Sequence, residues 1–241
     1  MRILCIPDVH NKPWIFDEAD KLLAEKKADC AVQIGDLLDD WGQEFAIEQY
    51  SRTLQRCIKF HKDHPDTVWI MGDHDFSYHH TEIPYKNSGH SKFVEGEVNT
   101  WLRQMERIGA SQQIIHVIDG VIFTHAGLGM DWVKSLVPRG THWEDDLEYV
   151  YNLVKSASTQ ELWEDVGPLW LRPQLYPTEM CPAKLQVVGH TPIEYPYEQN
   201  GVLSTDTFST CRDGAPLGDQ NFCIVDTETG LWQPTKEILH E

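Results

Sequence analysis

The sequence predicts an α/β fold in which short parallel strands alternate with helices. The chain has 241 residues, a length that suits one domain with a sizeable buried core. In its first third, three short apolar runs are separated by helix-like segments, which indicates parallel βαβ units. Polar residues follow directly after each run, as is typical of the carboxyl ends of strands in a parallel sheet.

The first third supplies the strands and helices of these units. Strands are predicted at Ile3–Ile6, Ala31–Ile34 and Val68–Met71. Apolar residues at helical spacing predict a helix over Trp14–Lys27, and Glu44–His64 has the pattern of a long amphipathic helix.

A polar and aromatic stretch from about Phe76 to Val98 has little periodicity and is predicted to be a long loop. Asn99 and Thr100 are candidate N-caps of a helix that continues through about Arg107.

The second half predicts a mixed sheet. Ile114–Ile118 and Val121–Thr124 are predicted to form a hairpin that turns at Asp119-Gly120, and Thr141–Gln160 is acidic and helical. Later strands are predicted at Leu185–Val188, Val202–Thr205 and Phe222–Val225. Residues 1–241 are therefore expected to form a single domain, with the segments 76–98 and 130–182 decorating its site.

The charge balance narrows the range of partners and substrates that the protein is expected to bind. Lys and Arg number 20 and Asp and Glu number 38, which gives a net charge of −18. Because such a surface repels phosphate backbones, binding to duplex nucleic acid or to an anionic membrane is not expected. A small phosphorylated substrate held on metal ions remains compatible, since a bound metal reverses the local sign. Six scattered cysteines and the absence of an N-terminal apolar span predict a cytoplasmic protein. The oligomeric state stays open.

Five short blocks rich in Asp, Gly and His follow the predicted strands. They are Asp8-Val9-His10, Gly35-Asp36-Leu37-Leu38-Asp39, Gly72-Asp73-His74-Asp75, Thr124-His125-Ala126-Gly127 and Gly189-His190-Thr191-Pro192. Carboxylates and neutral imidazoles suit divalent metals such as Mn, Fe, Zn or Mg. A shared carboxylate can bridge two such ions about 3.5–4 Å apart. The glycines before Asp36, Asp73 and His190 are expected to let the backbone turn sharply and approach the metals.

In this order the blocks resemble those of the calcineurin-like metallophosphoesterase superfamily, which read D-x-H, G-D-x-x-D, G-N-H-[DE], H-[AG]-G and G-H-x. The resemblance implies a four-layer α/β sandwich of two mixed β-sheets flanked by helices. It also implies a phosphoesterase that uses two divalent metal ions and attacks phosphorus through a metal-bound hydroxide. Manganese is the first expectation, with Fe, Zn or Mg as alternatives.

The resemblance implies roles for individual residues. Metal ligands would be Asp8 and His10 for the first ion, Asp36 for both, and Asp73, His125 and His190 for the second. His74 would be the general acid and Asp39 would orient it, although Asp39 alone could be only an N-cap. Arg172, in Leu169-Trp170-Leu171-Arg172-Pro173, would bind substrate phosphate, unless it pairs with surface carboxylates instead.

The details are similar to the bacterial and phage serine/threonine phosphatases and the diadenosine tetraphosphatases. Pro192 stands where many phosphodiesterases and nucleases have a second His. Two residues depart from that branch, because Asp40 replaces an expected Arg and Asp73 an expected Asn. The extra carboxylate at Asp73 predicts tighter metal binding and a weaker pull on an anionic substrate.

Hydrolysis of a small-molecule or peptidyl phosphate monoester, or of a nucleotide pyrophosphate, is the leading hypothesis. A phosphodiesterase or nuclease is the second. A weakly active or inactive protein that binds metal and a phosphorylated ligand is the third.

Overall fold

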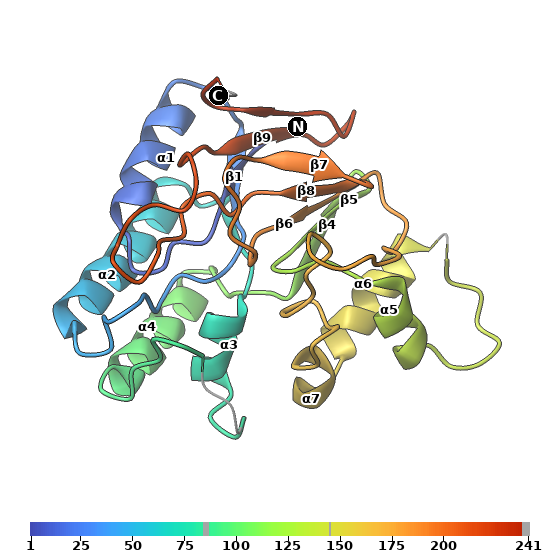
Figure 1. Ribbon diagram of the computed structural model, residues 1–241, viewed down its shortest axis with the longest axis horizontal. Helices are drawn as coiled ribbons and strands as arrows, with labels where there is room; N and C mark the ends of the chain where they lie inside the picture. Colours follow the sequence, from blue (N-terminus) through green and yellow to red (C-terminus); the bar gives the residue numbers. More distant parts are fainter. Residues whose placement is uncertain (84–86, 145, 238–241) are drawn as a thin grey trace.

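The structure, a computed structural model, describes residues 1–83, 87–144 and 146–237. It has four layers, with two β-sheets inside and helices on both outer faces (Figure 1). The predicted α/β fold with two mixed sheets flanked by helices is therefore confirmed.

Each sheet combines parallel and antiparallel strands. In spatial order the first sheet consists of β10 (Trp232–Pro234), β9 (Cys223–Asp226), β1 (Arg2–Ile6), β2 (Cys30–Gln33) and β3 (Val68–Trp69). The second sheet consists of β4 (Ile115–Ile118), β5 (Val121–Thr124), β6 (Leu185–Val188), β8 (Val202–Ser204) and β7 (Tyr197–Gln199). β1, β2 and β3 run parallel, and so do β5, β6 and β8.

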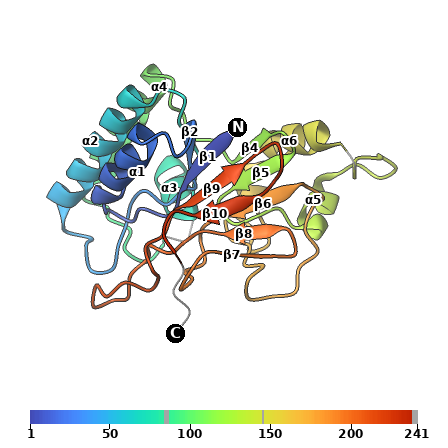
Figure 2. The ribbon, with the colours of Figure 1, turned by 90° about the horizontal axis from the view of Figure 1, so that it is seen from above.

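The helices form two groups on opposite sides of the sheets (Figure 2). Against the first sheet lie α1 (Trp14–Ala24), α2 (Ile47–Asp63) and α4 (Glu95–Arg107). Against the second lie α5 (Met130–Leu136), α6 (Leu147–Ser156) and α7 (Thr159–Leu162). Between the groups, α3 (Asp73–His79) places Tyr78 in the first core and Phe76 in the second.

Alternation along β1 explains why its sequence is apolar throughout. Ile3 and Cys5 point into the core between the two sheets. Leu4 and Ile6 point into the core under the first group of helices. Successive side chains of a strand face opposite sides, so a strand covered on both sides needs a continuous apolar run.

The predicted hairpin is also confirmed. β4 and β5 pair antiparallel with Ile118 opposite Val121. Asp119 and Gly120 have φ values of 52° and 83°, the left-handed pair that a tight two-residue hairpin turn requires.

The long loop predicted over 76–98 is wrong at both ends, because α3 continues to His79 and α4 begins at Glu95. The residues 84–86 lie outside the described part. A helix of 7 residues, such as α3, is too short to give a periodic apolar pattern. Asn99 and Thr100 lie inside α4 rather than capping it. The Thr100 hydroxyl donates to the carbonyl of Gly96 at 2.9 Å, a bond to the preceding turn that helix interiors offer threonine.

In the second half, the acidic region splits into α6 and α7, and residue 145 within it is not described. The second of these helices, α7, begins after Ser158, because the Ser158 hydroxyl and the Glu161 carboxylate form a capping box there. The helix α5 and the strands β7 and β10 were not predicted. The two strands have three residues each. Pro234 is tolerated in β10 because that strand lies at a sheet edge.

In the described part of the chain, no helix combines the length and the apolar character needed to cross a membrane.

Candidate metal centre

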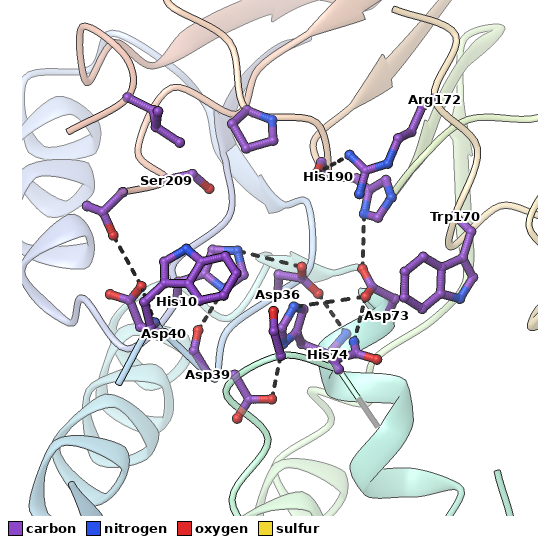
Figure 3. A pocket seen from close by; sticks show the side chains of 16 residues that line it. His10, Asp36, Asp39, Asp40, Asp73, His74, Trp170, Arg172, His190 and Ser209 are labelled. Atoms are coloured by element: carbon purple, nitrogen blue, oxygen red, sulfur yellow. Dashed lines mark hydrogen bonds and ion pairs between the residues drawn. The ribbon is translucent and has the colours of Figure 1, made fainter. Parts of the chain in front are cut away.

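Four of the five blocks line a cavity of about 390 Å³ at one end of the two sheets (Figure 3), and His125 of the remaining block joins them through Asp36 and Asp73. Their residues follow the strands in turn: Asp8 and His10 after β1, Asp36 and Asp39 after β2, Asp73 and His74 after β3, His125 after β5, and His190 after β6. The carboxyl ends of parallel strands in both sheets thus supply the site, as predicted for an open α/β sheet.

Four of the predicted ligands form what we call the buried group: Asp36, Asp73, His125 and His190. Each offers one ligand atom within 4.8 Å of the others. Asp73 Oδ1 lies 3.1 Å from His125 Nε2 and 3.0 Å from His190 Nδ1. Burial alone would raise the pKa of Asp73, but the charges of His190 and His74 hold it well below its usual value.

Backbone contacts fix the His125 ring in this group. Its Nδ1 donates to the carbonyl of Ile34 at 2.8 Å. Its Nε2 therefore faces Asp73 and, at 3.4 Å, Asp36 Oδ2. A histidine whose one nitrogen is held by a carbonyl presents the other to a metal in a fixed tautomer.

A second set, which we call the open group, consists of His10, Asp36 and His74, again with ligand atoms within 4.8 Å. His10 Nδ1 donates to the carbonyl of Asp39 at 2.8 Å, and its Nε2 lies 3.7 Å from Asp36 Oδ2. Asp36 belongs to both groups, which is the position that a bridging carboxylate needs.

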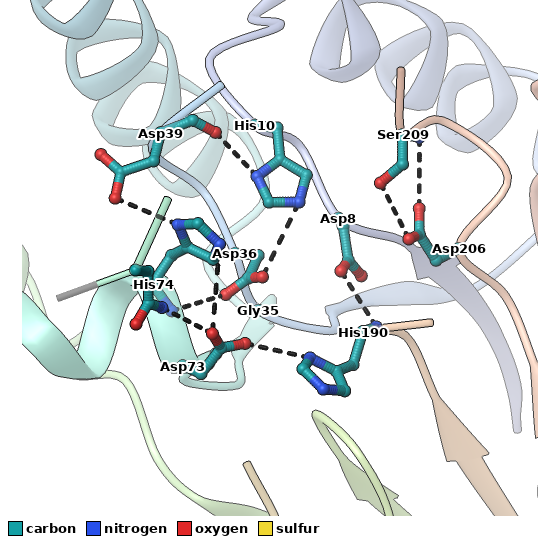
Figure 4. A network of polar contacts seen from close by, with 12 residues as sticks. Asp8, His10, Gly35, Asp36, Asp39, Asp73, His74, His190, Asp206 and Ser209 are labelled. Carbon is teal, nitrogen blue, oxygen red and sulfur yellow. Dashed lines mark hydrogen bonds and ion pairs between the residues drawn. The ribbon is translucent and has the colours of Figure 1, made fainter. Parts of the chain in front are cut away.

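Asp8 belongs to neither group, but its carboxylate contacts the backbone of His190, a member of the buried group (Figure 4). Its Oδ2 accepts the backbone N–H of His190 at 3.0 Å. Its Oδ1 is buried and has no hydrogen-bond partner among the described residues. Burial and then the charge of Asp206 raise the pKa of Asp8 well above its usual value.

The residues present fit divalent cations. In the described part of the chain, Asp8 Oδ1 and His190 Nε2 are both buried without a hydrogen-bond partner. Such atoms are costly to bury unless a ligand satisfies them. Together with the carboxylates of Asp36 and Asp73, they form a mixed oxygen and imidazole donor set. That set suits Mn, Fe, Zn or Mg without choosing among them.

The backbone of the site is unusually left-handed. His10, Asp36, Asp39 and His190 have φ values of 43°, 52°, 64° and 63°, a conformation that is uncommon outside glycine, although Asp and His adopt it more often than most side chains. Strain of this kind gathers at functional sites, where the surrounding structure enforces it.

Of the three glycines, only Gly35 needs a positive φ, at 106°. A Cβ there would lie 2.7 Å from His125 Nδ1. Gly72 and Gly189 lack a positive φ, so the expected sharp turn is not their role. A Cβ on them would collide with the carboxylates of Asp36 and Asp8. They therefore allow close approach.

The candidate general acid lines the cavity beside its partner. His74 Nδ1 lies 3.1 Å from Asp39 Oδ2. Burial lowers the pKa of His74, but the charges of Asp36 and Asp73 outweigh it and raise the pKa to about 10 in the polypeptide alone. The ring lines the cavity, where a bound substrate would lie.

Arg172 also lines the cavity. It donates to the carbonyl of His190 at 3.3 Å and to the Thr191 hydroxyl at 3.2 Å. Among the described residues it forms no ion pair with a carboxylate, so the alternative of a surface salt bridge finds no support. Its remaining N–H groups are available to phosphate oxygens.

Asp40 does not act as an isolated negative charge. Its carboxylate lies 3.0 Å from Lys12 Nζ, and both side chains are 11% exposed. The Thr210 hydroxyl donates to the other oxygen at 3.1 Å. The charge of Asp40 is therefore largely offset by Lys12 at the cavity edge.

Three residues of the site were missed from the sequence. Asp206 is buried and accepts from the backbone and hydroxyl of Ser209. It follows β8 as the other blocks follow their strands, so the same rule applied to that strand would have found it. Asn87 donates to Asp73 Oδ2 at 2.5 Å from a loop without a recognisable motif. Trp170 packs against the second core and also lines the cavity, edge-on to His190.

A family match and the likeness to one solved phosphatase agree with this architecture. The model of the calcineurin-like phosphoesterase family matches residues 1–210. No curated protein sequence matches significantly. Among solved structures, a serine/threonine phosphatase from Saccharomyces cerevisiae with similarity to human phosphatase PP5 has a TM-score of 0.54 at 13% identity, covering 100% of this chain and 81% of that one. Yfce, a phosphoesterase from E. coli, has a TM-score of 0.43 at 12% identity, covering 94% of this chain and 88% of that one.

At these identities the structural likeness concerns the fold alone. The family match is of another kind, because it extends over most of the chain and includes all five blocks. The chain therefore belongs to the calcineurin-like phosphoesterase family and is a metal-dependent phosphoesterase.

Proposed function

We propose that the protein hydrolyses a small phosphate monoester, or a nucleotide pyrophosphate, at a two-metal centre. Its ligands would be Asp8, His10, Asp36, Asp73, His125 and His190. The observation that carries the proposal is Asp36, whose Oδ2 lies 3.7 Å from His10 Nε2 and 3.4 Å from His125 Nε2. One carboxylate oxygen within reach of two imidazoles, one following β1 and one following β5, is what a pair of bridged metals requires.

When bound, the metals would supply charge neutralisation at the phosphoryl oxygens and a lowered pKa for the attacking water. Manganese is our first choice for both positions. The remaining work falls to the chain. Arg172 binds and orients the phosphoryl group, and His74, held by Asp39, delivers the proton that the leaving oxygen needs.

Three features favour a compact ester over a long polyanion. Arg172 is the one arginine that lines the described part of the cavity, and Asp40 stands where a second arginine would be expected. Pro192 cannot supply the extra imidazole associated with many diesterases. A second cavity of about 510 Å³ also borders Trp170 and Arg172. Its wall includes Trp132 and could receive the alcohol part of the ester.

The scattered cysteines, all six of them free, also lead us to propose a reducing compartment such as the cytoplasm.

Hydrolysis of p-nitrophenyl phosphate and of bis-p-nitrophenyl phosphate by Mn-loaded protein tests the proposal. The monoester should react much faster, and Asp36→Ala should abolish the reaction and the bound metal together. Asp66→Ala, which removes an exposed carboxylate, is the matched control and should change neither. A preference for the diester would favour the phosphodiesterase alternative. Full metal binding without turnover would favour the ligand-binding alternative.

A further inference from the structure

We infer that Tyr50 and Tyr78 are positioning residues that hold the Asp39 carboxylate and, through it, the ring of His74. This inference rests on the proposed function, in which His74 is the general acid. The two tyrosines come from different helices, α2 and α3, and neither belongs to a motif that the sequence singled out.

Both hydroxyls donate to the same carboxylate oxygen. Tyr50 Oη lies 2.7 Å and Tyr78 Oη 2.6 Å from Asp39 Oδ1. The other oxygen, Oδ2, lies 3.1 Å from His74 Nδ1. One edge of the carboxylate is thus occupied by two fixed donors, and the opposite edge is presented to the imidazole.

The clamp, by which we mean Tyr50, Tyr78 and Asp39, is buried. Tyr50 and Asp39 are 0% exposed and Tyr78 is 1% exposed. Burial and then the charge of Asp39 raise the pKa of both phenols, so both hydroxyls stay protonated and act as donors. A buried carboxylate with several donors has little freedom to rotate, and the ring paired with it is restrained in turn.

The back of the clamp is closed by the segment 89–91. The backbone N–H of Ser91 donates to Tyr78 Oη at 3.0 Å. The Gly89 carbonyl lies 3.1 Å from Tyr50 Oη, and the single proton of that hydroxyl goes to Asp39 Oδ1, the nearer acceptor at 2.7 Å. The ring of His90 stacks on Tyr78 with centroids 4.3 Å apart. These contacts fix the phenols themselves, so the restraint extends from the backbone to the candidate acid.

Phenylalanine would fill the same space, so shape alone does not explain the two hydroxyls. A buried hydroxyl is retained only where it has a partner, and here both share the partner of His74. The consequence for catalysis is specific. A general acid matters most when the leaving group is a poor one, so loosening the clamp should slow esters of weakly acidic alcohols more than esters of acidic phenols.

The test compares Tyr50→Phe and Tyr78→Phe with the unaltered protein on phenyl phosphate and on p-nitrophenyl phosphate, all loaded with Mn. We expect kcat on phenyl phosphate to fall about tenfold, and kcat on p-nitrophenyl phosphate to fall about twofold. The double variant should lose less than the product of the single losses, because both hydroxyls act on one oxygen. Tyr151→Phe, on α6 in the opposite group of helices, is the control and should affect both substrates equally little.

Tyr78→Phe also leaves the Ser91 N–H without its acceptor, which can prevent this variant from folding. In that case, Tyr50→Phe alone carries out the test. Equal losses on both substrates, or no loss, would overturn the inference while leaving the proposed function in place. Failure of the unaltered protein to hydrolyse either ester would instead count against the proposed function.

An NMR measurement needs no turnover, so it tests the inference even if the unaltered protein hydrolyses neither ester. The proton on His74 Nδ1 should give a low-field NMR signal that His74→Gln removes. In Tyr50→Phe this signal should shift or broaden through faster exchange with water. An unchanged signal would show that the hydroxyls do not restrain the ring, and the inference would fail.

Discussion

The buried group and the open group share Asp36 but are held in different ways. In the buried group, the His125 and His190 side chains are 0% and 3% exposed and both contact Asp73 directly. In the open group, the His10 and His74 side chains are 16% and 15% exposed. They are fixed from behind, by a backbone carbonyl and by the carboxylate of Asp39.

Under the proposed function, the difference predicts a division of labour within one centre. Contacts among the proposed ligands themselves should favour tight retention of a cation in the buried group. Support from behind leaves the faces of His10 and His74 toward the cavity, where a substrate arrives.

The largest effect is expected from His125→Ala compared with His10→Ala. His125→Ala should remove the more tightly held metal and slow hydrolysis about a thousandfold, because a metal supplies several kcal/mol of transition-state stabilisation. His10→Ala should lower the metal content by one ion and leave the other in place. Metal content by mass spectrometry, together with initial rates, checks this. Equal metal loss in both variants would contradict the division.

Gly35→Ala should damage the fold around the buried group. The new Cβ would meet His125 Nδ1 and Gly72 N at 2.7 Å with φ at 106°, which should cost about 3 kcal/mol of unfolding free energy. Gly42→Ala has a similarly positive φ of 68° but open space around it, so it should cost only about 1 kcal/mol. Urea unfolding measures both values. Similar losses would mean that backbone strain, and not the close approach, dominates.

Arg172→Lys should impair substrate binding and spare the metals. A lysine keeps the charge but cannot grip two oxygens at once, so kcat/KM should fall about 10- to 100-fold, mainly through KM. Arg139→Lys, at an exposed position, is the control and should leave the kinetics unchanged. A fall in metal content in Arg172→Lys would show that this residue supports the metal centre and not only the substrate.

The smallest effect concerns pH. Because the pKa of Asp8 is raised in the folded polypeptide, the stability this carboxyl contributes is present at low pH and is lost as pH rises through its folded pKa. Metal binding needs the ionised form. The Tm measured with Mn²⁺, relative to the Tm measured with EDTA, should therefore rise with pH. The apparent affinity for Mn²⁺ should increase about tenfold per pH unit for each proton that the metal displaces. Asp8→Asn should flatten this dependence, and a pH-independent increase in the unaltered protein would contradict it.

The strands and the five blocks were predictable because one physical cause underlies both. Parallel strands covered on both faces must be apolar throughout, and the first polar residues after them are placed at a common edge. Position along the chain was enough to bring Asp8, Asp36 and His190 together. The same reasoning failed for α3, which is too short for periodicity, and it was not applied to Asp206 after β8.

Other features could not be predicted because they depend on packing between segments. Lys12 offsets the charge of Asp40 only because the turn after β1 lies against the turn after β2. The sequence does not show that the two turns are in contact. The clamp joins residues 39, 50 and 78, which no regular spacing relates. The positive φ values of His10 and His190 also cannot be predicted from the residue type alone.

The hydrogen bond between Asp8 and the backbone of His190 joins positions 182 residues apart. During synthesis, the first carboxylate of the centre leaves the ribosome long before its partner does. A nascent chain therefore holds only fragments of the centre until most of it has been translated. The proposed metal ligands thus come together only late in synthesis, once strands of both sheets have been translated.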